Sequence, residues 1–108
     1  MGAKRPGDDH VDDAAKPWME NQVRSLIREF IRNVMSGTGE PVPEARLAED
    51  LDFNFLIKLE LRFALEDEFG LPTISDATSR SFLTVQDVEN YVVDQLRAAG
   101  RLSQDIAV

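Results

Sequence analysis

The chain has 108 residues, of which 43% are hydrophobic, and this favours one small globular domain with a modest core over a disordered polypeptide. It has no cysteine, which excludes disulfides, thiolate metal sites and a cysteine nucleophile. The net charge of −8 argues against nucleic-acid partners and suits protein partners with basic surfaces. No apolar run approaches the roughly 18 residues of a membrane span, and the start does not read as a secretory signal, so a cytoplasmic location is expected.

The first half of the chain is predicted to form a tail, a helix and a long loop. Residues 1–18 are rich in glycine, proline and aspartate, include the only histidine (His10), and predict a disordered tail. An amphipathic helix is predicted from Met19 to Met35, and glycines and prolines then begin a loop that runs to about Asp52. The helix is expected to bury Val23, Leu26, Ile27, Phe30 and Val34, and the loop to be anchored by Val42, Leu47 and Leu51.

A second helix is predicted from Asn54, a residue type that caps helix N-termini, to Phe69, with Gly70 and Pro72 as stop signals. Its expected buried side consists of Leu56, Leu59, Phe63 and Phe69, with Leu61 and Leu65 at the margins.

Two further helices are predicted beyond this point. One is a short turn over residues 76–80, and the other begins after Thr84, whose spacing to Asp87 is a weak variant of the capping box. The last helix is expected to end at Gly100 and to bury Val85, Val88, Tyr91, Val92 and Leu96. The predicted fold is therefore all-α: a monomeric, antiparallel four-helix bundle over residues 19–100 with a long first loop, followed by a short tail over 101–108.

Residues 49–69 read E-D-L-D-F-N-F-L-I-K-L-E-L-R-F-A-L-E-D-E-F. This segment resembles the second helix of acyl carrier proteins, where the pattern is E-D-L-G-x-D-S-L-x-x-V-E-L-x-x-x-L-E-E-x-F. Residues 84–92, T-V-Q-D-V-E-N-Y-V, resemble the opening of that family's last helix. The resemblance covers roughly residues 23–96 and implies an acyl-carrier-like bundle.

The chain departs from this family at the position that carries its chemistry. The resemblance implies that the serine of D-S-L takes a phosphopantetheine arm from coenzyme A, and this reaction needs a hydroxyl oxygen as nucleophile. Phe55 stands at that position, and Asn54 replaces the preceding aspartate. Phosphopantetheine is therefore expected of the family but cannot be attached at Phe55, and no other cofactor is expected.

Several interpretations of this departure stay open. The favoured one is a degenerate carrier module that acts through protein–protein contacts in fatty-acid, polyketide or nonribosomal peptide synthesis. A second is a working carrier modified at another serine, for which Ser36, Ser75, Ser79 and Ser81 are the candidates. A single Ser→Phe change in a working carrier would leave Phe53 and Asn54 unexplained. The last is a bundle that binds an acyl chain or another lipid without a covalent bond.

The candidate partner-binding residues lie at and after the start of the second helix. Phe53 and Phe55 either plug the end of the bundle or form an exposed aromatic anchor, and Phe53 is expected to be the more exposed of the two. Family resemblance suggests that carboxylates of this helix dock onto basic patches of partner proteins. The acids concerned are Glu60, Glu66 and Asp67, and the positive charges of Lys58 and Arg62 are expected to interrupt their face.

For non-covalent lipid binding, the expected cavity lies between the helices. Its predicted lining is Leu56, Leu59, Phe63, Val88 and Val92.

Catalysis and metal binding have no support in the sequence, so we expect no enzymatic activity, no catalytic residue and no metal site. The predicted folded part has neither histidine nor cysteine, and no glycine-rich phosphate loop occurs. Residues 50–61 begin like a calcium-binding loop, but Phe55 stands where that loop needs glycine and Leu61 where it needs glutamate.

Overall fold

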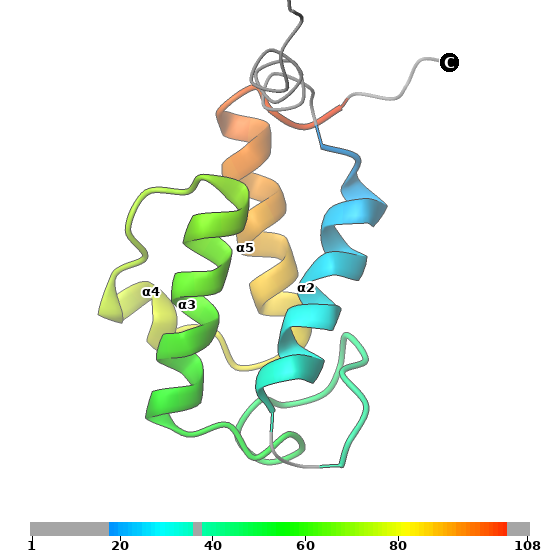
Figure 1. Cartoon of the computed structure of the whole chain (residues 1–108), viewed down its shortest axis with the longest axis vertical. Helices are drawn as coiled ribbons and strands as arrows, with labels where there is room; N and C mark the ends of the chain where they lie inside the picture. The colour runs from blue at the N-terminus through cyan, green and yellow to red at the C-terminus, as the bar shows by residue number, and fades with distance from the viewer. Residues whose placement is uncertain (1–17, 36–37, 104–108) are drawn as a thin grey trace, which may run out of the picture.

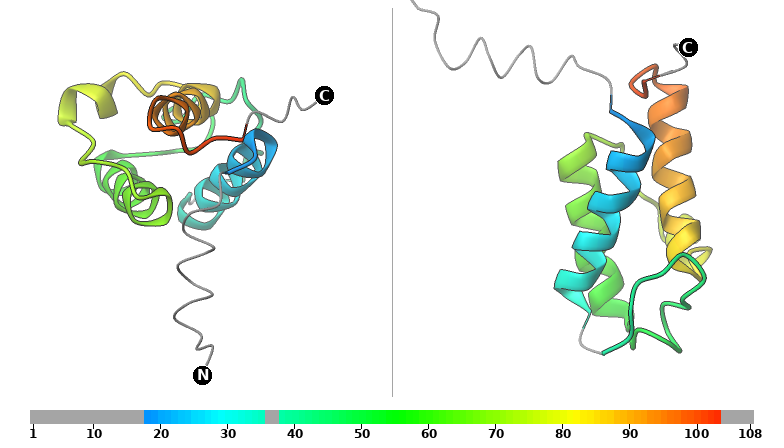
Figure 2. Two further views of the ribbon diagram at one scale, coloured as in Figure 1. Left: turned by 90° about the horizontal axis from the view of Figure 1, so that it is seen from above. Right: turned by 90° about the vertical axis from the view of Figure 1, so that its right-hand side faces the viewer.

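The structure is a computed structural model that describes residues 18–35 and 38–103. Within these ranges the chain forms four helices and no β-strand: α2 (Glu20–Val34), α3 (Phe55–Phe69), α4 (Asp76–Arg80) and α5 (Val85–Ala98). Figure 1 shows α2 running antiparallel to α3 and α5, with the short α4 beside α3. Seen from above in Figure 2, α2, α3 and α5 form a triangle around the core. The predicted all-α bundle with a long first loop is confirmed.

Helix α2 forms where the sequence predicted it, within one residue at each end. Its fully buried residues are Val23, Ile27 and Ile31, which repeat every four positions and pack against α3 and α5. The predicted apolar residues Leu26, Phe30 and Val34 are only partly buried at the edge of this face.

Local signals also define both ends of α3. The Asn54 side chain accepts a hydrogen bond from the Ile57 backbone N–H at 2.9 Å, which satisfies one of the free donors of the first turn. At the other end Gly70 adopts φ 61°, a left-handed conformation that glycine reaches without steric cost.

The predicted buried side of α3 is wrong except for Phe69. The core is contacted by Leu61, Leu65 and Phe69, whereas Leu56 and Phe63 are exposed and Leu59 is half-buried. The cause lies in the composition of the helix, because apolar side chains occur on both of its sides and periodicity alone does not choose between them. Contacts with α2 and α5 bury the side that carries Leu61, Leu65 and Phe69.

Helices α4 and α5 agree with the prediction. The Ser75 side chain caps α4, and Thr84 and Asp87 form a reciprocal capping box at the start of α5. The stripe of α5 is buried as predicted except for the half-buried Tyr91, and Gly100, with φ 71°, follows its last turn.

The long loop between α2 and α3 is anchored on the core by Leu47 and Leu51, which are fully buried, while Val42 is half exposed. Backbone hydrogen bonds hold it: Leu47 N–H donates to the Leu83 carbonyl at 2.9 Å, and Phe53 N–H donates to the Leu47 carbonyl at 2.8 Å. Just before α3, Asp52 has φ 57°. This conformation favours glycine, and glycine is the residue of the E-D-L-G-x-D-S-L pattern at this position.

The bundle extends beyond the predicted limits of 19–100 at both ends. The Trp18 ring packs edge-on against Phe69 with centroids 4.8 Å apart, and Trp18 pairs with Leu102 through backbone hydrogen bonds to Arg101 and Ser103. Leu102 is itself buried. The rest of both predicted tails, 1–17 and 104–108, lies outside the described residues.

One acidic side chain is buried between α2 and α5. Glu89 is 1% exposed and accepts hydrogen bonds from Arg24 Nη1 at 3.0 Å and Arg28 Nε at 2.9 Å. Two guanidinium groups therefore compensate the buried charge and tie the two helices together.

In the described ranges, every helix is too short or too polar to cross a bilayer.

Candidate functional site at the start of α3

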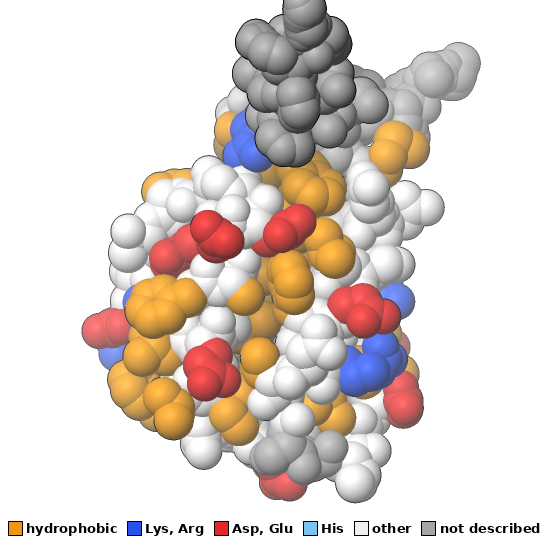
Figure 3. All heavy atoms as spheres, in the orientation of Figure 1, with side chains coloured by type: hydrophobic (Ala, Val, Ile, Leu, Met, Phe, Trp, Pro, Cys, Tyr) orange, Lys and Arg blue, Asp and Glu red, His pale blue; other side chains and the backbone are white. Residues whose placement is uncertain are grey.

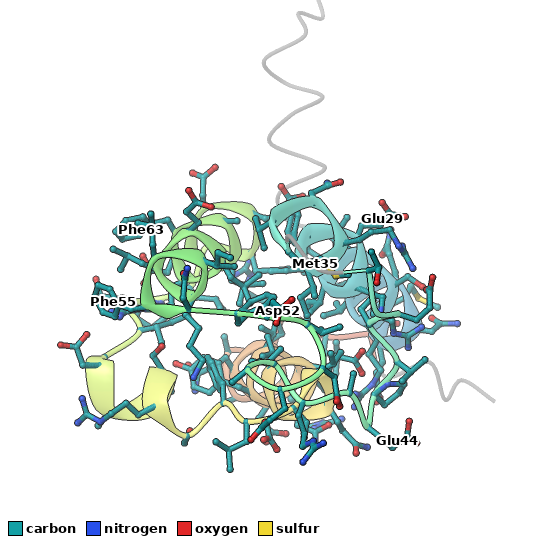
Figure 4. All side chains as sticks on the ribbon, turned by 90° about the horizontal axis from the view of Figure 1, so that it is seen from below. Glu29, Met35, Glu44, Asp52, Phe55 and Phe63 are labelled. Carbon is teal, nitrogen blue, oxygen red and sulfur yellow. The ribbon has the colours of Figure 1, made fainter. Side chains whose placement is uncertain are left out.

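Phe55 is the first residue of α3 and is 74% exposed. Figure 4 shows its side chain pointing outward from α3, on the same side of the bundle as Phe63 and opposite Glu29. The Asn54 cap, which satisfies one backbone donor of the first turn, does not involve the Phe55 side chain. Of the two alternatives for Phe55, a plug of the bundle or an exposed aromatic, the structure shows the exposed one.

Phe53 was expected to be the more exposed member of the pair, and this expectation is wrong. Its side chain is only 7% exposed and belongs to the core cluster. Phe53 packs with core residues of distant segments, and its N–H donates to the Leu47 carbonyl at 2.8 Å just before the helix begins. The exposed aromatic is Phe55, two residues later, on the outer side of α3.

Four apolar side chains form a continuous stripe on the outer side of α3: Phe55, Leu56, Leu59 and Phe63. Leu59 lies four residues after Phe55, three after Leu56 and four before Phe63, so it neighbours each of them on the helix surface. Figure 3 shows hydrophobic side chains gathered over this helix. Leu56 and Phe63 are 60% and 57% exposed, which is unusual for large apolar residues and marks this outer stripe as a candidate contact surface.

Carboxylates lie along the same side of α3. Glu60 and Asp67 are exposed and lie three residues before and four residues after Phe63, so they flank the outer stripe. The third predicted acid, Glu66, is half-buried, and its Oε2 accepts a hydrogen bond from the Ile74 backbone N–H at 2.7 Å. Glu66 therefore holds the loop after α3 in place.

The expected interruption of the acidic face by Arg62 does not occur. Arg62 is buried and donates from Nη1 to Asp76 Oδ1 at 2.9 Å and from Nη2 to the Ile74 carbonyl. The positive charge of Arg62 therefore pairs with Asp76 and links α3 to α4. Lys58 also turns toward α4, where its Nζ donates to the Ser79 carbonyl at 3.4 Å. Burial lowers the pKa of Lys58.

The five residues predicted to line a lipid cavity are not brought together. Leu56 and Phe63 face outward, Leu59 is half-buried, and Val88 and Val92 are packed in the core without exposed surface. A pocket of about 370 Å³ lies instead between α3, α4 and the end of the long loop. Its walls are formed by Ala48, Phe53, Asn54, Phe55, Lys58, Leu59, Arg62, Asp76, Ser79 and Arg80.

The amino-acid sequence is similar to those of known proteins over most of its length. No protein-family profile matches the chain. It is, however, 34% identical over 80 residues to the acyl carrier protein of Thermosynechococcus vestitus, covering 73% of this chain and 98% of that protein. It is also 32% identical over 76 residues to the acyl carrier protein of Thermobifida fusca, covering 69% of this chain and 95% of that one.

The chain belongs to the acyl carrier protein family.

Membership groups it with acyl carrier proteins rather than with enzymes, and the four-helix architecture is consistent with this family. The family's usual phosphopantetheine does not fit position 55, because a benzyl side chain offers no hydroxyl oxygen to form the phosphodiester. The exposed start of α3, where the acyl carrier pattern places its serine, is occupied here by an aromatic ring.

The other candidate serines are placed differently. Ser75 Oγ accepts from the Thr78 N–H as the α4 cap, and Ser81 Oγ donates to the Thr78 carbonyl at 2.6 Å. Ser79 is buried. Ser36 lies outside the described residues. Ser75, Ser79 and Ser81 thus belong to α4 and its ends, and none of them stands at the N-terminus of α3.

Proposed function

We propose that this acyl-carrier-family chain is not phosphopantetheinylated and acts through protein–protein contacts made by the outer side of α3, within a fatty-acid, polyketide or nonribosomal peptide type of pathway. The proposal rests on the outward position of Phe55. This side chain stands where the family pattern has its attachment serine, and it forms part of an apolar contact surface instead.

The outer stripe explains the proposed mode of contact. Phe55, Leu56, Leu59 and Phe63 present apolar surface, and a partner that covers them removes this surface from water, which is favourable by about 25 cal/mol per Å². Large aromatic side chains near the centre of an interface commonly contribute most of its affinity. Phe55 and Phe63 are the two aromatic rings of this surface.

Charge defines the class of partner. Glu60 and Asp67 flank the outer stripe, Arg62 points inward, and the whole chain carries a net charge of −8. A surface with an apolar groove bordered by lysine or arginine would complement it, and the long-range attraction would raise the association rate. We therefore propose protein partners with basic patches and a monomeric chain between encounters.

The experiment is a competition assay with an enzyme that docks onto acyl carriers. A broad-specificity phosphopantetheinyl transferase modifies a serine-bearing acyl carrier protein with coenzyme A, while this chain is added in increasing amounts. We expect the chain to slow modification of the carrier while its own intact mass stays unchanged.

Two variants separate specific docking from general charge effects. Glu60→Lys and Phe63→Ala should each weaken the inhibition about tenfold, whereas Glu29→Lys should not, because Glu29 is an exposed acid on the opposite side of the bundle. A gain of phosphopantetheine mass by the wild-type chain would disprove the non-carrier role. Inhibition that is absent, or equal for all three variants, would disprove docking through α3.

A further inference from the structure

The pocket beside Phe55 contains a lysine whose amine has no acidic partner among the described residues. Lys58 is half-buried in this pocket of about 370 Å³, and its Nζ donates only to the neutral Ser79 carbonyl, at 3.4 Å. Burial lowers the pKa of Lys58, because its ammonium group has lost part of its water. A larger share of this amine is therefore neutral, and the neutral form is the one that acts as a nucleophile.

Two arginines line the same pocket, Arg62 from α3 and Arg80 from α4. The only acid in the lining, Asp76, already accepts from Arg62 Nη1 at 2.9 Å. Arg80 has no hydrogen-bond or ion-pair partner among the described residues, and Arg62 Nε is buried without an acceptor there. The pocket therefore offers hydrogen-bond donors and positive charge to an anion that forms at Lys58.

We propose that Lys58 is a covalent modification site at which carbon dioxide reversibly forms a carbamate, and that Arg80 and Arg62 stabilise the carbamate anion. The neutral Nζ forms a bond to the carbon of carbon dioxide, one C=O bond opens to place a negative charge on oxygen, and one proton passes from Nζ to water. Nζ keeps one hydrogen for the Ser79 carbonyl. Atoms and charge balance without a further reactant, and the reverse reaction needs only a proton.

The charge of the product decides between carbon dioxide and other reagents that modify amines. An acylating reagent would leave a neutral amide on Lys58, and Arg80 would still lack a partner. A carbamate instead carries a negative charge on two oxygens, in the planar arrangement that a guanidinium recognises. The reaction thus replaces one of three cations in the pocket lining by an anion that the other two can stabilise.

The polarity of carbon dioxide also suits the molecule. The net charge of −8 opposes the approach of an anion, whereas carbon dioxide is uncharged and becomes an anion only at the lysine. Phe53, Phe55 and Leu59 give the pocket apolar walls, which favour an uncharged reagent and a neutral amine over ions. The modification goes beyond the proposed contacts of the outer stripe, because it takes place on the side of α3 that faces α4.

The test equilibrates the full chain with carbon dioxide and bicarbonate in a mildly alkaline buffer. Triethyloxonium then traps each carbamate as a stable ethyl ester, and peptide mass spectrometry locates it. The lysines of the chain are Lys4, Lys16 and Lys58, so Lys16 serves as a reference in the same sample. We expect at least about tenfold more trapped carbamate at Lys58 than at Lys16, since an ordinary lysine is almost entirely protonated at this pH.

Variants test the role of the arginines and separate the carbamate from a bound ion. Arg80→Gln should lower trapping at Lys58 about threefold, an effect limited by the exposure of Arg80 to water. Arg97→Gln removes an exposed arginine in the last turn of α5 and should leave trapping unchanged. In ¹⁵N-labelled protein, carbon dioxide should shift amides around the pocket in wild type but not in Lys58→Arg, which keeps the charge and lacks the reactive amine. The same spectra report whether each variant is folded.

Three results would each overturn the proposal: trapping at Lys58 that does not exceed trapping at Lys16, trapping that Arg80→Gln and Arg97→Gln affect equally, or amide shifts that persist in Lys58→Arg. The last result would mean that bicarbonate binds as an ion. These outcomes leave the contacts of the outer stripe untouched, because the competition assay uses Glu60 and Phe63, which do not line this pocket.

Discussion

Replacing Phe55 by serine tests both the exposure of this side chain and the carrier nature of the scaffold. Complete burial of a phenylalanine contributes about 1.5–3 kcal/mol, and Phe55 is 74% exposed, so only about a quarter of that, or about 0.4–0.8 kcal/mol, is lost in Phe55→Ser. For a domain of this size the loss corresponds to a decrease in Tm of about 2–6 °C.

Phe53→Ser is the matched control, because it makes the same chemical change two residues away at a side chain that is 7% exposed. Phe53→Ser should lower the free energy of unfolding by about 3–5 kcal/mol, as for other truncations of buried aromatic residues. Urea unfolding can be followed by the fluorescence of Trp18, the single tryptophan, which packs on Phe69 in the folded bundle. If Phe55→Ser destabilises the protein as much as Phe53→Ser, the outward position of Phe55 is wrong, and with it the proposed contact surface.

The same variant has a chemical readout. With coenzyme A and a phosphopantetheinyl transferase, Phe55→Ser, or Asn54→Asp combined with Phe55→Ser, should gain one phosphopantetheine by intact mass, because the hydroxyl then lies at the exposed start of α3. Wild-type protein should gain none. A result in which both variants stay unmodified would show that the surface around position 55 no longer supports the transfer.

Three further predictions concern the scaffold. Glu89→Gln should lower the free energy of unfolding by about 2–3 kcal/mol in urea titrations, since two arginines lose their buried carboxylate; a loss below 0.5 kcal/mol, about the effect of an ordinary surface substitution, would contradict this. Asp52→Gly should raise the free energy of unfolding by up to about 1 kcal/mol, because the φ of Asp52 is 57° and glycine adopts this conformation without strain. Asp52→Ala should not raise it, and equal effects of the two variants would argue against backbone strain. The Arg46 N–H and guanidinium lower the pKa of Asp50 below its ordinary value of 3.8. Wild type should therefore be more stable than Asp50→Asn at neutral pH, with a difference that disappears as the pH falls through the folded-state pKa; a difference that is constant from pH 7 to 3 would refute the linkage.

Local signals explain why the helices were predictable. Asn54, Ser75 and Thr84 each cap a helix through hydrogen bonds that span three residues, and Gly70 ends α3 through its own backbone conformation. Such interactions depend on neighbours in sequence, so helix boundaries can be recognised without knowledge of the tertiary fold.

The side of α3 that faces the core could not be predicted in this way. Leu56, Leu59 and Phe63 form one apolar side and Leu61, Leu65 and Phe69 form another, and both have helical spacing. Arg62 looked like a surface charge in the sequence, but it is buried, because Asp76 and the Ile74 carbonyl accept its hydrogen bonds. Contacts from α2, α4 and α5 decide these orientations.

The sequence by itself determined that this acyl-carrier-family chain has no hydroxyl at position 55, because covalent chemistry depends on the residue present and not on its surroundings. Only the tertiary structure decided that Phe53 is buried while Phe55 is exposed, and that Lys58 and Arg80 line a common pocket. The physical reason is that burial is shared between segments distant in sequence. Phe53 packs into the core cluster that these segments form together, α4 supplies Arg80, and no other described segment covers Leu56 and Phe63 on the outer side of α3.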